Sequence, residues 1–550
     1  MPFLGKILYI FLLVIAVQAA NPTVTISSGV VIGTTYSATN PPSSTATANV
    51  FLGIPFASSP PQRFSPPEPP ASWSTPLSVQ TPPPGCIEKS SRDENRRPVD
   101  YNMLSDTPPL TQSEDCLYLN VYAPQNATPE NLKDVMFWIY GGNLEDGNSN
   151  LDVYNGTSFA VHEDVVLVST NYRLNIYGFP NEPGVAPGKA NVGFLDQRLA
   201  LDWVQNNINQ FGGDPTRVTI FGESAGGYSA KQLLATPPSP LPFRAAIVES
   251  QQRELPGNGT ANFLNAAAHF NCEDTQCLRE VPVQDLTDYI REENMFFAPV
   301  YDNITCVSDV RPHIENRQFA NVPLLMGTNK DELSQAVYAL SGNGTMTPQK
   351  TLQGLLERLG MESLEALGLS MIILGRLQNQ LHLESALTLT DLSRIVTDLA
   401  FTCPSGAIVN ATATRSSADT DTDTDTAAAP VWRYRFSASI QQNTFPDQGA
   451  THASEIIFVF GTYGLIAPNE TFIELSQYMQ PLWANFAKNP TAGPLWDAIP
   501  RDGDGGGDIG AVLGDIGVDW NPGEEDVALA GVDEYCAVLL PYSEMLGLAW

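Results

Sequence analysis

Residues 217–228 read RVTIFGESAGGY, and this stretch indicates both the fold and the chemistry of the chain. The run up to Phe221 is rich in strand-forming residues, whereas the residues after Gly227 favour a helix. A serine placed between two such elements in the pattern G-x-S-x-G is typical of a nucleophile elbow, a strained turn that lifts the hydroxyl clear of the sheet. Gly222 and Gly226 remove side chains that would clash in that turn. Ser224 is therefore the candidate nucleophile.

Continuous apolar segments of strand length recur on both sides of this turn. Helical stretches such as Leu195–Gln210 lie between several of them. Alternation of buried strands and helices predicts an α/β fold with a large, mostly parallel central sheet flanked by helices. The strand candidates are Asp134–Tyr140, Val165–Thr170, Val218–Phe221, Ala245–Val248, Val322–Met326 and Val431–Phe436.

Four segments depart from this alternation. Residues 23–57 alternate β-branched residues with turns, and residues 58–85 are too rich in proline for a helix or a central strand. Residues 416–430, with their Asp-Thr repeats, predict a disordered insertion. Residues 501–525 are acidic and rich in glycine and are expected to be a loop. Nothing reads as an interdomain linker, so residues 20–550 are expected to form a single domain.

Residues 1–19 have the features of a secretory signal peptide. Lys6 precedes an apolar run from Ile7 to Val17, and small residues follow where a signal peptidase requires them. The run is too short for a stable membrane anchor, and no other segment reads as a transmembrane helix. Asn-x-Ser/Thr acceptors agree with a secreted glycoprotein. They are Asn126, Asn155, Asn258, Asn303, Asn343, Asn410 and Asn469.

The formal net charge of −32 at pH 7 limits the partners of the chain. Nucleic acid and anionic membrane surfaces would be repelled by a protein of this charge. Solubility in an acidic extracellular medium explains the charge better than a binding role does. The oligomeric state is left open by the sequence.

Seven cysteines in a secreted chain predict disulfides and one remaining thiol. Cys272 and Cys277 enclose only four residues and are the safest pair. A second pair joins Cys86 to Cys116 around a loop rich in Arg, Asp and Asn. A third pair, Cys403 with Cys536, is plausible, and it leaves Cys306 as the remaining thiol.

A serine hydroxyl needs a base, and after a nucleophile elbow the chain order is serine, then acid, then histidine. Of the five histidines, His452 best suits the base. It follows Ser224 and a strand-like segment, and its small neighbours at residues 449–454 leave room for a substrate. The other four are less suitable. His162 lies at the edge of an apolar strand, and His269 lies in an alanine-rich helical stretch. His313 lies in a loop ahead of the expected acid, and His382 lies in a leucine-rich helical stretch.

The acid is expected at the carboxyl end of a strand between Ser224 and His452. Residues 322–332 supply a strand, a turn and two adjacent carboxylates, Asp331 and Glu332. The pattern alone does not choose between them, and both could be solvated loop acids.

The oxyanion of a tetrahedral intermediate needs backbone N–H donors. One comes from Ala225, the residue after the nucleophile. Others are expected from the glycine-rich turn after an earlier strand, at residues 141–143, which read Gly-Gly-Asn. A simple hairpin turn would also use Gly-Gly, but the place of this turn after a strand and ahead of the elbow favours the functional interpretation.

The chain resembles the type-B carboxylesterase and lipase family, which has the α/β-hydrolase fold and includes secreted fungal lipases, carboxylesterases and cholinesterases. The likeness runs from about Val24 to the C-terminus. Its most specific segments are FLGIPFA at 51–57, EDCLYLNVY at 114–122, Asn191 to Gly227 with FGGDP at 211–215, and His452 to Phe460.

The resemblance implies Glu332, not Asp331, as the acid of the triad. It places Gly142 and Asn143 at the two oxyanion positions beside Ala225. It also implies that the loop between Cys86 and Cys116 is a lid or a wall of the active-site gorge.

The chain departs from the family pattern at four positions. Asn143 replaces a glycine of the oxyanion turn, which keeps the N–H but strains the backbone or puts an amide into the pocket. Leu333 and Gln251 also replace glycines. Ala453 after His452 replaces a fourth glycine and is expected to be a milder change. These departures leave the reaction class intact and bear on substrate range and rate.

These observations predict a serine ester hydrolase that acts on small-molecule or lipid esters without a metal or organic cofactor. A carboxylesterase is favoured over a lipase, because residues 87–115 are mostly polar despite Tyr101, Met103 and Leu104. A cholinesterase is disfavoured, because the family's cation-binding tryptophan lies in this loop and the nearest tryptophan here, Trp73, precedes it. A catalytically impaired adhesion or binding protein of the same fold is the alternative from a different class.

Overall fold

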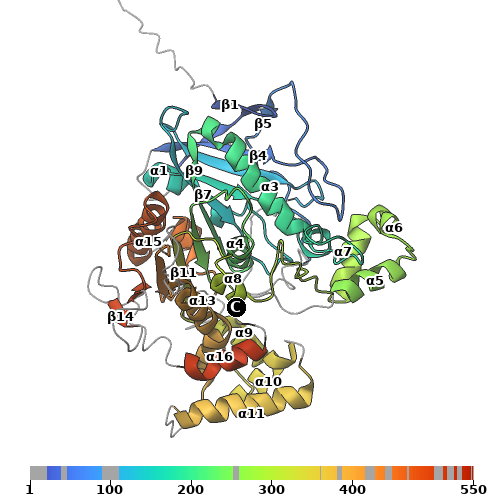
Figure 1. Ribbon diagram of the computed structural model, residues 1–550, viewed down its shortest axis with the longest axis vertical. Helices are drawn as coiled ribbons and strands as arrows, with labels where there is room; N and C mark the ends of the chain where they lie inside the picture. Colours follow the sequence, from blue (N-terminus) through green and yellow to red (C-terminus); the bar gives the residue numbers. More distant parts are fainter. Residues whose placement is uncertain are drawn as a thin grey trace, which may run out of the picture.

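The computed structural model of the chain is shown in Figure 1. The leader at 1–19, most of the Asp-Thr insertion and the middle of the Cys86–Cys116 loop lie outside the residues that the structure describes. The described residues are 21–38, 46–89, 111–251, 259–342, 344–358, 361–380, 387–414, 428–439, 449–466, 470–500, 512–516, 526–528, 535–546 and 548.

An eleven-stranded, mostly parallel sheet forms the centre of the molecule (Figure 1). Its strand order is β14-β13-β12-β11-β10-β9-β7-β8-β6-β4-β3. The run from β13 to β8 is parallel throughout, and antiparallel strands extend it at both edges. The bounds are β3 Thr34–Ser37, β4 Thr47–Pro55, β6 Tyr118–Pro124, β7 Lys133–Ile139, β8 Val166–Thr170, β9 Gly213–Glu223, β10 Ala245–Glu249, β11 Leu324–Asn329, β12 Val431–Phe436, β13 Val512–Ile516 and β14 Asp526–Ala528. A separate small sheet contains β1 Thr23–Ile26, β2 Gly29–Ile32 and β5 Leu77–Ser78.

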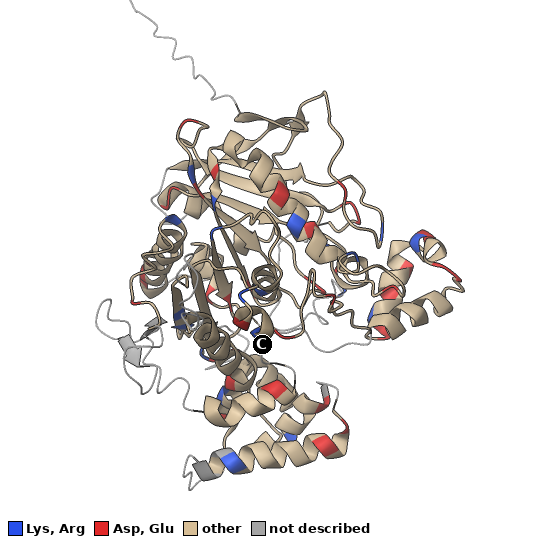
Figure 2. Ribbon diagram, viewed as in Figure 1, with Lys and Arg blue, Asp and Glu red and all other residues tan. Residues whose placement is uncertain are grey.

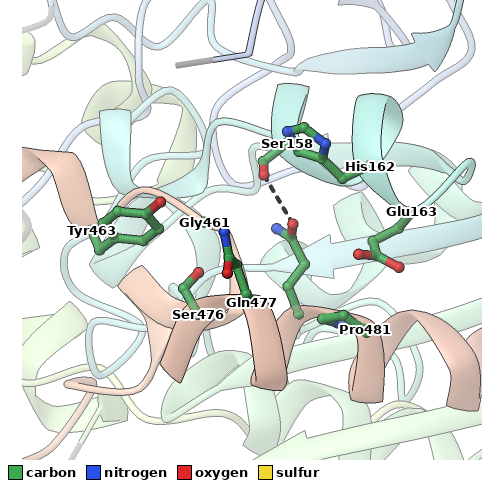
Figure 3. A pocket seen from close by; sticks show the side chains of 9 residues that line it. Ser158, His162, Glu163, Gly461, Tyr463, Ser476, Gln477 and Pro481 are labelled. Carbon is green, nitrogen blue, oxygen red and sulfur yellow. Dashed lines mark hydrogen bonds between the residues drawn. The ribbon is translucent and has the colours of Figure 1, made fainter. Parts of the chain in front are cut away.

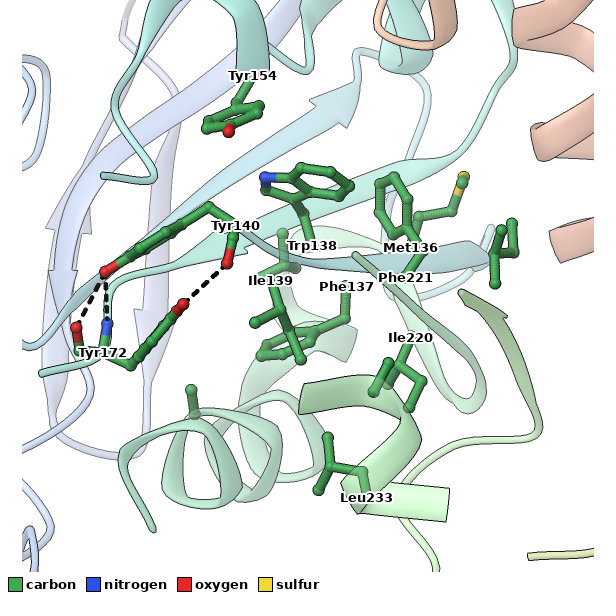
Figure 4. Close-up of a cluster of buried hydrophobic side chains, with 14 of the residues drawn as sticks. Met136, Phe137, Trp138, Ile139, Tyr140, Tyr154, Tyr172, Ile220, Phe221 and Leu233 are labelled. Atoms are coloured by element: carbon green, nitrogen blue, oxygen red, sulfur yellow. Dashed lines mark hydrogen bonds between the residues drawn. The ribbon is translucent and has the colours of Figure 1, made fainter. Parts of the chain in front are cut away.

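The central strands are buried on both faces, as their continuous apolar sequences predict. In β7 every residue from Asp134 to Ile139 is buried. Figure 4 shows the alternation: Trp138 lies beside Tyr154 and Phe221 on one face, whereas Phe137 and Ile139 point to the other. The ring centroids of Trp138 and Phe221 are 4.8 Å apart. Side chains of adjacent strands thus pack as layers on each face of the sheet.

Helices cover both faces. Helix α4 (Ala225–Ala235) packs on β9, β10 and β7. On the opposite face, Phe159 of α1 (Thr157–His162) reaches Phe221, and α15 (Glu470–Lys488) also contacts β7 and β9. The other α-helices are α2 Asn175–Gly178, α3 Val192–Asn207, α5 Gly259–His269, α6 Thr275–Glu280, α7 Val283–Glu292, α8 Arg311–Glu315, α9 Ser334–Leu340, α10 Pro348–Arg358, α11 Ser363–Gln380, α12 Leu389–Thr397, α13 Cys403–Ala413, α14 Ile456–Val459 and α16 Cys536–Met545.

Shorter helical turns join several of these elements. The 3-10 turns are η2 Asp152–Tyr154, η3 Ile208–Phe211 and η5 Tyr463–Leu465, and a π-helical turn, η4 Asp398–Thr402, leads into α13.

A smaller apolar cluster is formed by helices that lie at one end of the molecule, α10, α11 and α16 among them (Figure 1). It includes Leu352 of α10, Ile373 of α11 and Leu539 of α16. The main cluster contains residues from Ile26 to Ile499. The expectation of one domain over residues 20–550 stays a prediction.

The fold class and the predicted strands are confirmed, with element ends displaced by a few residues. The expectation of a loop over residues 501–525 is wrong in part, because β13 (Val512–Ile516) lies within it and pairs in parallel with β12. Valine, leucine and isoleucine are strand-forming types, and the composition of the surrounding residues concealed this short segment. His313 was expected in a loop but lies in the short helix α8, which has Pro312 at its start.

All three predicted disulfides are present in the structure. They join Cys86 to Cys116, Cys272 to Cys277 and Cys403 to Cys536. Cys306 stands outside them and is buried beside the Tyr228 hydroxyl.

Acidic side chains are spread over many elements of the molecule, α3, α7 and α11 among them (Figure 2). Among the residues that the structure describes, no helix is both long enough and apolar enough to span a bilayer.

Candidate active site

Ser224 sits in a strained turn between β9 and α4. Its backbone has φ 57° and ψ −120°, a conformation that an L-residue rarely adopts. Close packing with β7 leaves no room for side chains on either side of it: a Cβ at Gly222 would lie 2.6 Å from the Ile139 carbonyl, and one at Gly226 would collide with the same oxygen. The turn is also tied to β10 by a hydrogen bond from Ser224 N to Glu249 O (3.0 Å). The elbow predicted from the sequence therefore has the expected geometry.

The predicted oxyanion turn lies directly against this elbow. Strands β7 and β9 are parallel neighbours, so their carboxyl ends meet at one edge of the sheet. A Cβ at Gly141 would lie only 2.9 Å from the Ser224 Cβ, so glycine is required for this approach. Gly142 has φ 110°, and a Cβ there would collide with the Asp146 carbonyl. The turn therefore approaches the serine through backbone alone.

The backbone N–H groups expected to hold an oxyanion belong to two elements that converge at Ser224. Ala225 is the first residue of α4, a position whose N–H points out of the helix end. Asn143 follows Gly142 with φ 57°, and its side-chain Nδ2 donates to Glu145 Oε2 at 3.2 Å. The amide side chain expected at this position is thus engaged by a neighbouring carboxylate.

His452 and Glu332 form a hydrogen-bonded pair. His452 Nδ1 lies 2.6 Å from Glu332 Oε2, and the Glu332 side chain is fully buried. The Asn329 backbone N–H donates to the other Glu332 oxygen at 2.7 Å. Asp331 instead accepts from Ala450 N at 3.1 Å. The structure therefore places Glu332, and not Asp331, against the candidate base.

The second ring nitrogen of His452 faces the elbow. His452 Nε2 lies 3.1 Å from Oε1 of Glu223, the residue that directly precedes Ser224. The imidazole thus spans from Glu332 to the nucleophile turn, and Phe401 packs on it with ring centroids 5.2 Å apart. Proton transfer from the serine would require Nε2 to come within hydrogen-bond reach of Ser224 Oγ, and the contact with Glu223 places Nε2 beside the turn that carries this hydroxyl.

Two further carboxylates lie behind the histidine. Asn329 Nδ2 donates to Glu455 Oε2, and Glu249 is fully buried at the end of β10. Burial raises the pKa of Glu455, and the neighbouring Glu332 raises it further. Burial and Glu455 likewise raise the pKa of Glu249 well above its ordinary value. Both shifts favour the protonated, neutral form of these two buried carboxyl groups.

The φ values at the four positions that depart from the family pattern do not follow the order of severity expected from the sequence. Ala453, expected to be the mildest, has φ 63°, where an L-residue is strained. Leu333 has φ −101°, an ordinary value that needs no glycine. Gln251 is buried, and its Cβ lies 3.2 Å from where a Cβ of Gly227 would stand. Asn143 and Ala453 are therefore the positions where a missing glycine strains the chain.

Comparison with known proteins agrees with this geometry. The model of the carboxylesterase family matches residues 20–501. The chain belongs to the carboxylesterase family. The resemblance drawn from the sequence motifs is thereby confirmed.

The chain is similar to enzymes from several different organisms. It is 34% identical to the para-nitrobenzyl esterase of Bacillus subtilis (strain 168) over 472 residues, which cover 82% of this chain and 87% of the relative. It is 31% identical to liver carboxylesterase 1F of Rattus norvegicus over 506 residues, or 86% of each chain. Acetylcholinesterase of Electrophorus electricus is 33% identical over 490 residues, covering 80% of this chain and 76% of the relative. The protein is a carboxylic ester hydrolase.

Sequence reasoning missed Glu223, Glu249, Asn329 and Glu455 in this carboxylesterase. Glu249 ends the strand next to β9, so the meeting of parallel strand ends at one edge could have placed it near the elbow. Glu455 follows His452 by three residues in the turn that leads into α14, so the short separation could have placed the two side chains near each other. The contact of Glu223 with the histidine had no sequence signal.

The remaining histidines lie on other elements than His452. His269 ends α5 and stacks on Tyr289. His162 ends α1 and lines a cavity of about 170 Å³ between α1 and α15 (Figure 3). Ser158 donates to Gln480 across this cavity, which lies on the sheet face opposite α4. His382 lies outside the described residues.

Proposed function

We propose that this carboxylesterase is a secreted serine hydrolase of neutral carboxylic esters that works through an acyl-enzyme on Ser224. The observation that carries the proposal is the position of His452. One ring nitrogen is held by Glu332, and the other faces the elbow that presents the serine. Such a base can take the serine proton without a metal or an organic cofactor.

In the first half of the reaction, Ser224 Oγ attacks the ester carbonyl carbon while its proton moves to His452 Nε2. Glu332 accepts the Nδ1–H hydrogen bond and stabilises the cation that forms. The carbonyl oxygen becomes an oxyanion that the N–H groups of Gly142, Asn143 and Ala225 hold. The C–O bond to the alcohol then breaks, and the departing alkoxide takes the proton from Nε2.

In the second half, water replaces the alcohol. His452 removes a proton from the water as its oxygen attacks the acyl carbon, and a second tetrahedral intermediate forms. Its collapse returns a proton to Ser224 Oγ and releases the carboxylic acid. The same three N–H groups serve both intermediates.

The buried carboxylates support the preference for neutral esters. Glu223 and Glu332 both lie within 3.1 Å of a ring nitrogen of His452, at 3.1 and 2.6 Å. Negative charge at this position stabilises an imidazolium and repels an anionic substrate.

Short or bulky esters, the substrates of a carboxylesterase, are the preferred substrate class. A lid for interfacial activation would be strongly apolar, whereas the sequence of residues 87–115 is mostly polar. The same segment contains no tryptophan, so the cation-binding group of a cholinesterase is missing from the sequence there. A triacylglycerol lipase remains the second candidate.

Several features support secretion. The leader-like residues 1–19 and three disulfides are typical of an exported chain. Among the predicted glycosylation acceptors, Asn126 and Asn303 are exposed, whereas Asn155 and Asn410 are half-buried. Asn258, Asn343 and Asn469 lie outside the described residues.

Turnover of p-nitrophenyl butyrate by wild type and by Ser224→Ala tests the proposed function. We expect the variant to lose at least about 10⁴-fold in kcat. Equal turnover by the two proteins would refute the nucleophile, and no turnover by folded wild type would favour a binding protein. A higher kcat/KM for the butyrate than for the palmitate ester supports a carboxylesterase, and the reverse supports a lipase.

A further inference from the structure

The backbone strain of the oxyanion turn differs from that of the elbow, because it extends over several successive residues. Gly142, Asn143 and Leu144 have φ values of 110°, 57° and 59°, so three successive residues lie in the left-handed region. Only the first is a glycine. The left-handed region costs a residue such as leucine about 1–2 kcal/mol, and asparagine adopts it less readily than glycine does and with the help of local side-chain hydrogen bonds. Some contact must therefore hold this conformation against relaxation.

Backbone hydrogen bonds from Glu145 N and Asp146 N to Gly142 O hold part of the turn, and a buried ion pair adds a side-chain contact at Asn143. Lys89 Nζ lies 2.6 Å from Glu145 Oε1, and the other oxygen, Oε2, accepts from Asn143 Nδ2 at 3.2 Å. The Lys89 and Glu145 side chains are each only 13% exposed. Each carboxylate oxygen thus has one partner, and the carboxylate links the lysine to the residue at the oxyanion position.

The lysine itself is held firmly. Its backbone N–H donates to the Glu145 carbonyl at 3.0 Å, and its carbonyl accepts from Arg291 Nε at 2.9 Å. The preceding residue, Glu88, accepts from Gly147 N at 3.2 Å. Three residues before Lys89, Cys86 is cross-linked to Cys116. The base of the Cys86–Cys116 loop is therefore fastened to both ends of the segment 143–147.

We propose that Lys89 and Glu145 are positioning residues for the oxyanion hole, and that their ion pair holds Asn143 in the left-handed conformation that a glycine would adopt without help. This inference rests on the proposed function. Neither residue touches the reacting atoms: Glu145 acts through the Asn143 side chain, and Lys89 acts through Glu145.

A simpler alternative is that the ion pair only fastens the loop to the body of the protein. The chain offers a substitution that separates the two explanations. Asn143→Gly keeps the backbone N–H, removes the side chain that Glu145 holds, and relieves the strain at this φ. If the ion pair acts through Asn143, its removal should matter far less once residue 143 is a glycine.

The test is a double-mutant cycle on kcat for p-nitrophenyl butyrate. Lys89→Met in the wild-type background should lower kcat about tenfold with little change in KM, because a displaced N–H weakens oxyanion binding in the transition state. In the Asn143→Gly background, the same substitution should lower kcat less than about twofold. Lys89→Arg should restore most of the wild-type rate, because it restores the charge.

Lys133→Met is the matched control. Lys133 also makes a 2.6 Å ion pair, with Asp164, but it lies at the opposite end of β7. It should change kcat less than about twofold, since this pair contacts neither the elbow nor the oxyanion turn and its Asp164 side chain is 55% exposed. All rates are divided by the concentration of folded protein from near-UV circular dichroism, so that a poorly folding variant is not misread.

An equal loss of kcat on Lys89→Met in both backgrounds would overturn the inference and leave the ion pair as a fastening of the loop. A tenfold loss confined to KM would overturn it too. Wild type without turnover, or Ser224→Ala with full turnover, would instead refute the proposed function.

Discussion

The elbow and the oxyanion turn end neighbouring parallel strands and hold strained backbone within a few ångströms of each other, yet they are held in different ways. At the elbow, Gly222 and Gly226 let β9 and α4 pack so closely on β7 that a side chain at either position would collide with the Ile139 carbonyl. At the turn, Asn143 and Leu144 adopt left-handed conformations beside the Lys89–Glu145 ion pair.

The difference teaches that a strained backbone conformation can be maintained either by close steric packing or by an ion pair. Packing against backbone atoms does not depend on pH, on salt or on a distant side chain. An ion pair depends on all three. Substitutions and conditions should therefore affect the two regions in different ways.

The largest effect is expected on the acid–base side of the site. Glu332→Gln should lower kcat by about 10³–10⁴-fold, because an amide stabilises neither the correct tautomer nor the cation of His452. Asp331→Asn is the matched control and should stay within about threefold of wild type, since its oxygen can still accept from Ala450 N. Steady-state kinetics on both variants check this, and a reversed order would assign the acid to Asp331.

A substitution that disturbs the packing of the elbow should lower the activity. In Gly226→Ala the added methyl group would collide with the Ile139 carbonyl, which displaces Ser224. We expect kcat to fall about 10²-fold or more, since a shift of about 1 Å has effects of this size. Gly375→Ala in α11, where a Cβ meets nothing within 4 Å, is the control. Similar losses in both variants would show that close packing is not what holds the elbow.

Charge near His452 should set the pH range of the enzyme. Glu223→Gln removes a carboxylate 3.1 Å from Nε2 and makes the imidazolium less favourable. The acid limb of the kcat/KM profile should therefore move to lower pH, by about one unit. Glu163→Gln, at the end of α1 and paired with Lys488, should leave the profile in place. A shift to higher pH in Glu223→Gln would contradict the assignment.

The smallest effect on kcat is expected when a fall in pH weakens the ion pair at the oxyanion turn. Burial raises the pKa of Glu145 to about 7, although Lys89 opposes the shift and Asp146 adds to it. The ion pair needs the ionised carboxylate, so it weakens as pH falls through about 7. The kcat ratio of wild type to Asn143→Gly should then fall about two- to fivefold from about pH 8 to about pH 6. A constant ratio would show that this ionisation does not reach the oxyanion site.

The sequence predicted the fold and the candidate triad because both follow local patterns. Strand-forming and helix-forming residues around 217–228 indicated the elbow. The resemblance to the family indicated that Glu332, rather than the adjacent Asp331, is the acid. The structure then placed Glu332 against His452. β13 was missed because glycines and acids surround its few strand-forming residues.

Contacts between distant residues could not be predicted in this way. Lys89 and Glu145 are 56 residues apart and meet only because the loop base folds back on the end of β7. Glu223 reaches His452 across more than two hundred residues of sequence. Nor does a motif show which of four missing glycines strains the chain, because φ at Leu333 and Ala453 is set by the surrounding packing.

The most direct test of the central claim is the site of covalent modification by a fluorophosphonate ester. Intact-mass analysis and peptide mapping of the folded wild-type protein should show one adduct, on Ser224, with loss of activity in proportion to labelling. Labelling should be lost in Ser224→Ala and much slower in Glu332→Gln. An adduct on another residue, or full activity in protein labelled at Ser224, would contradict the account.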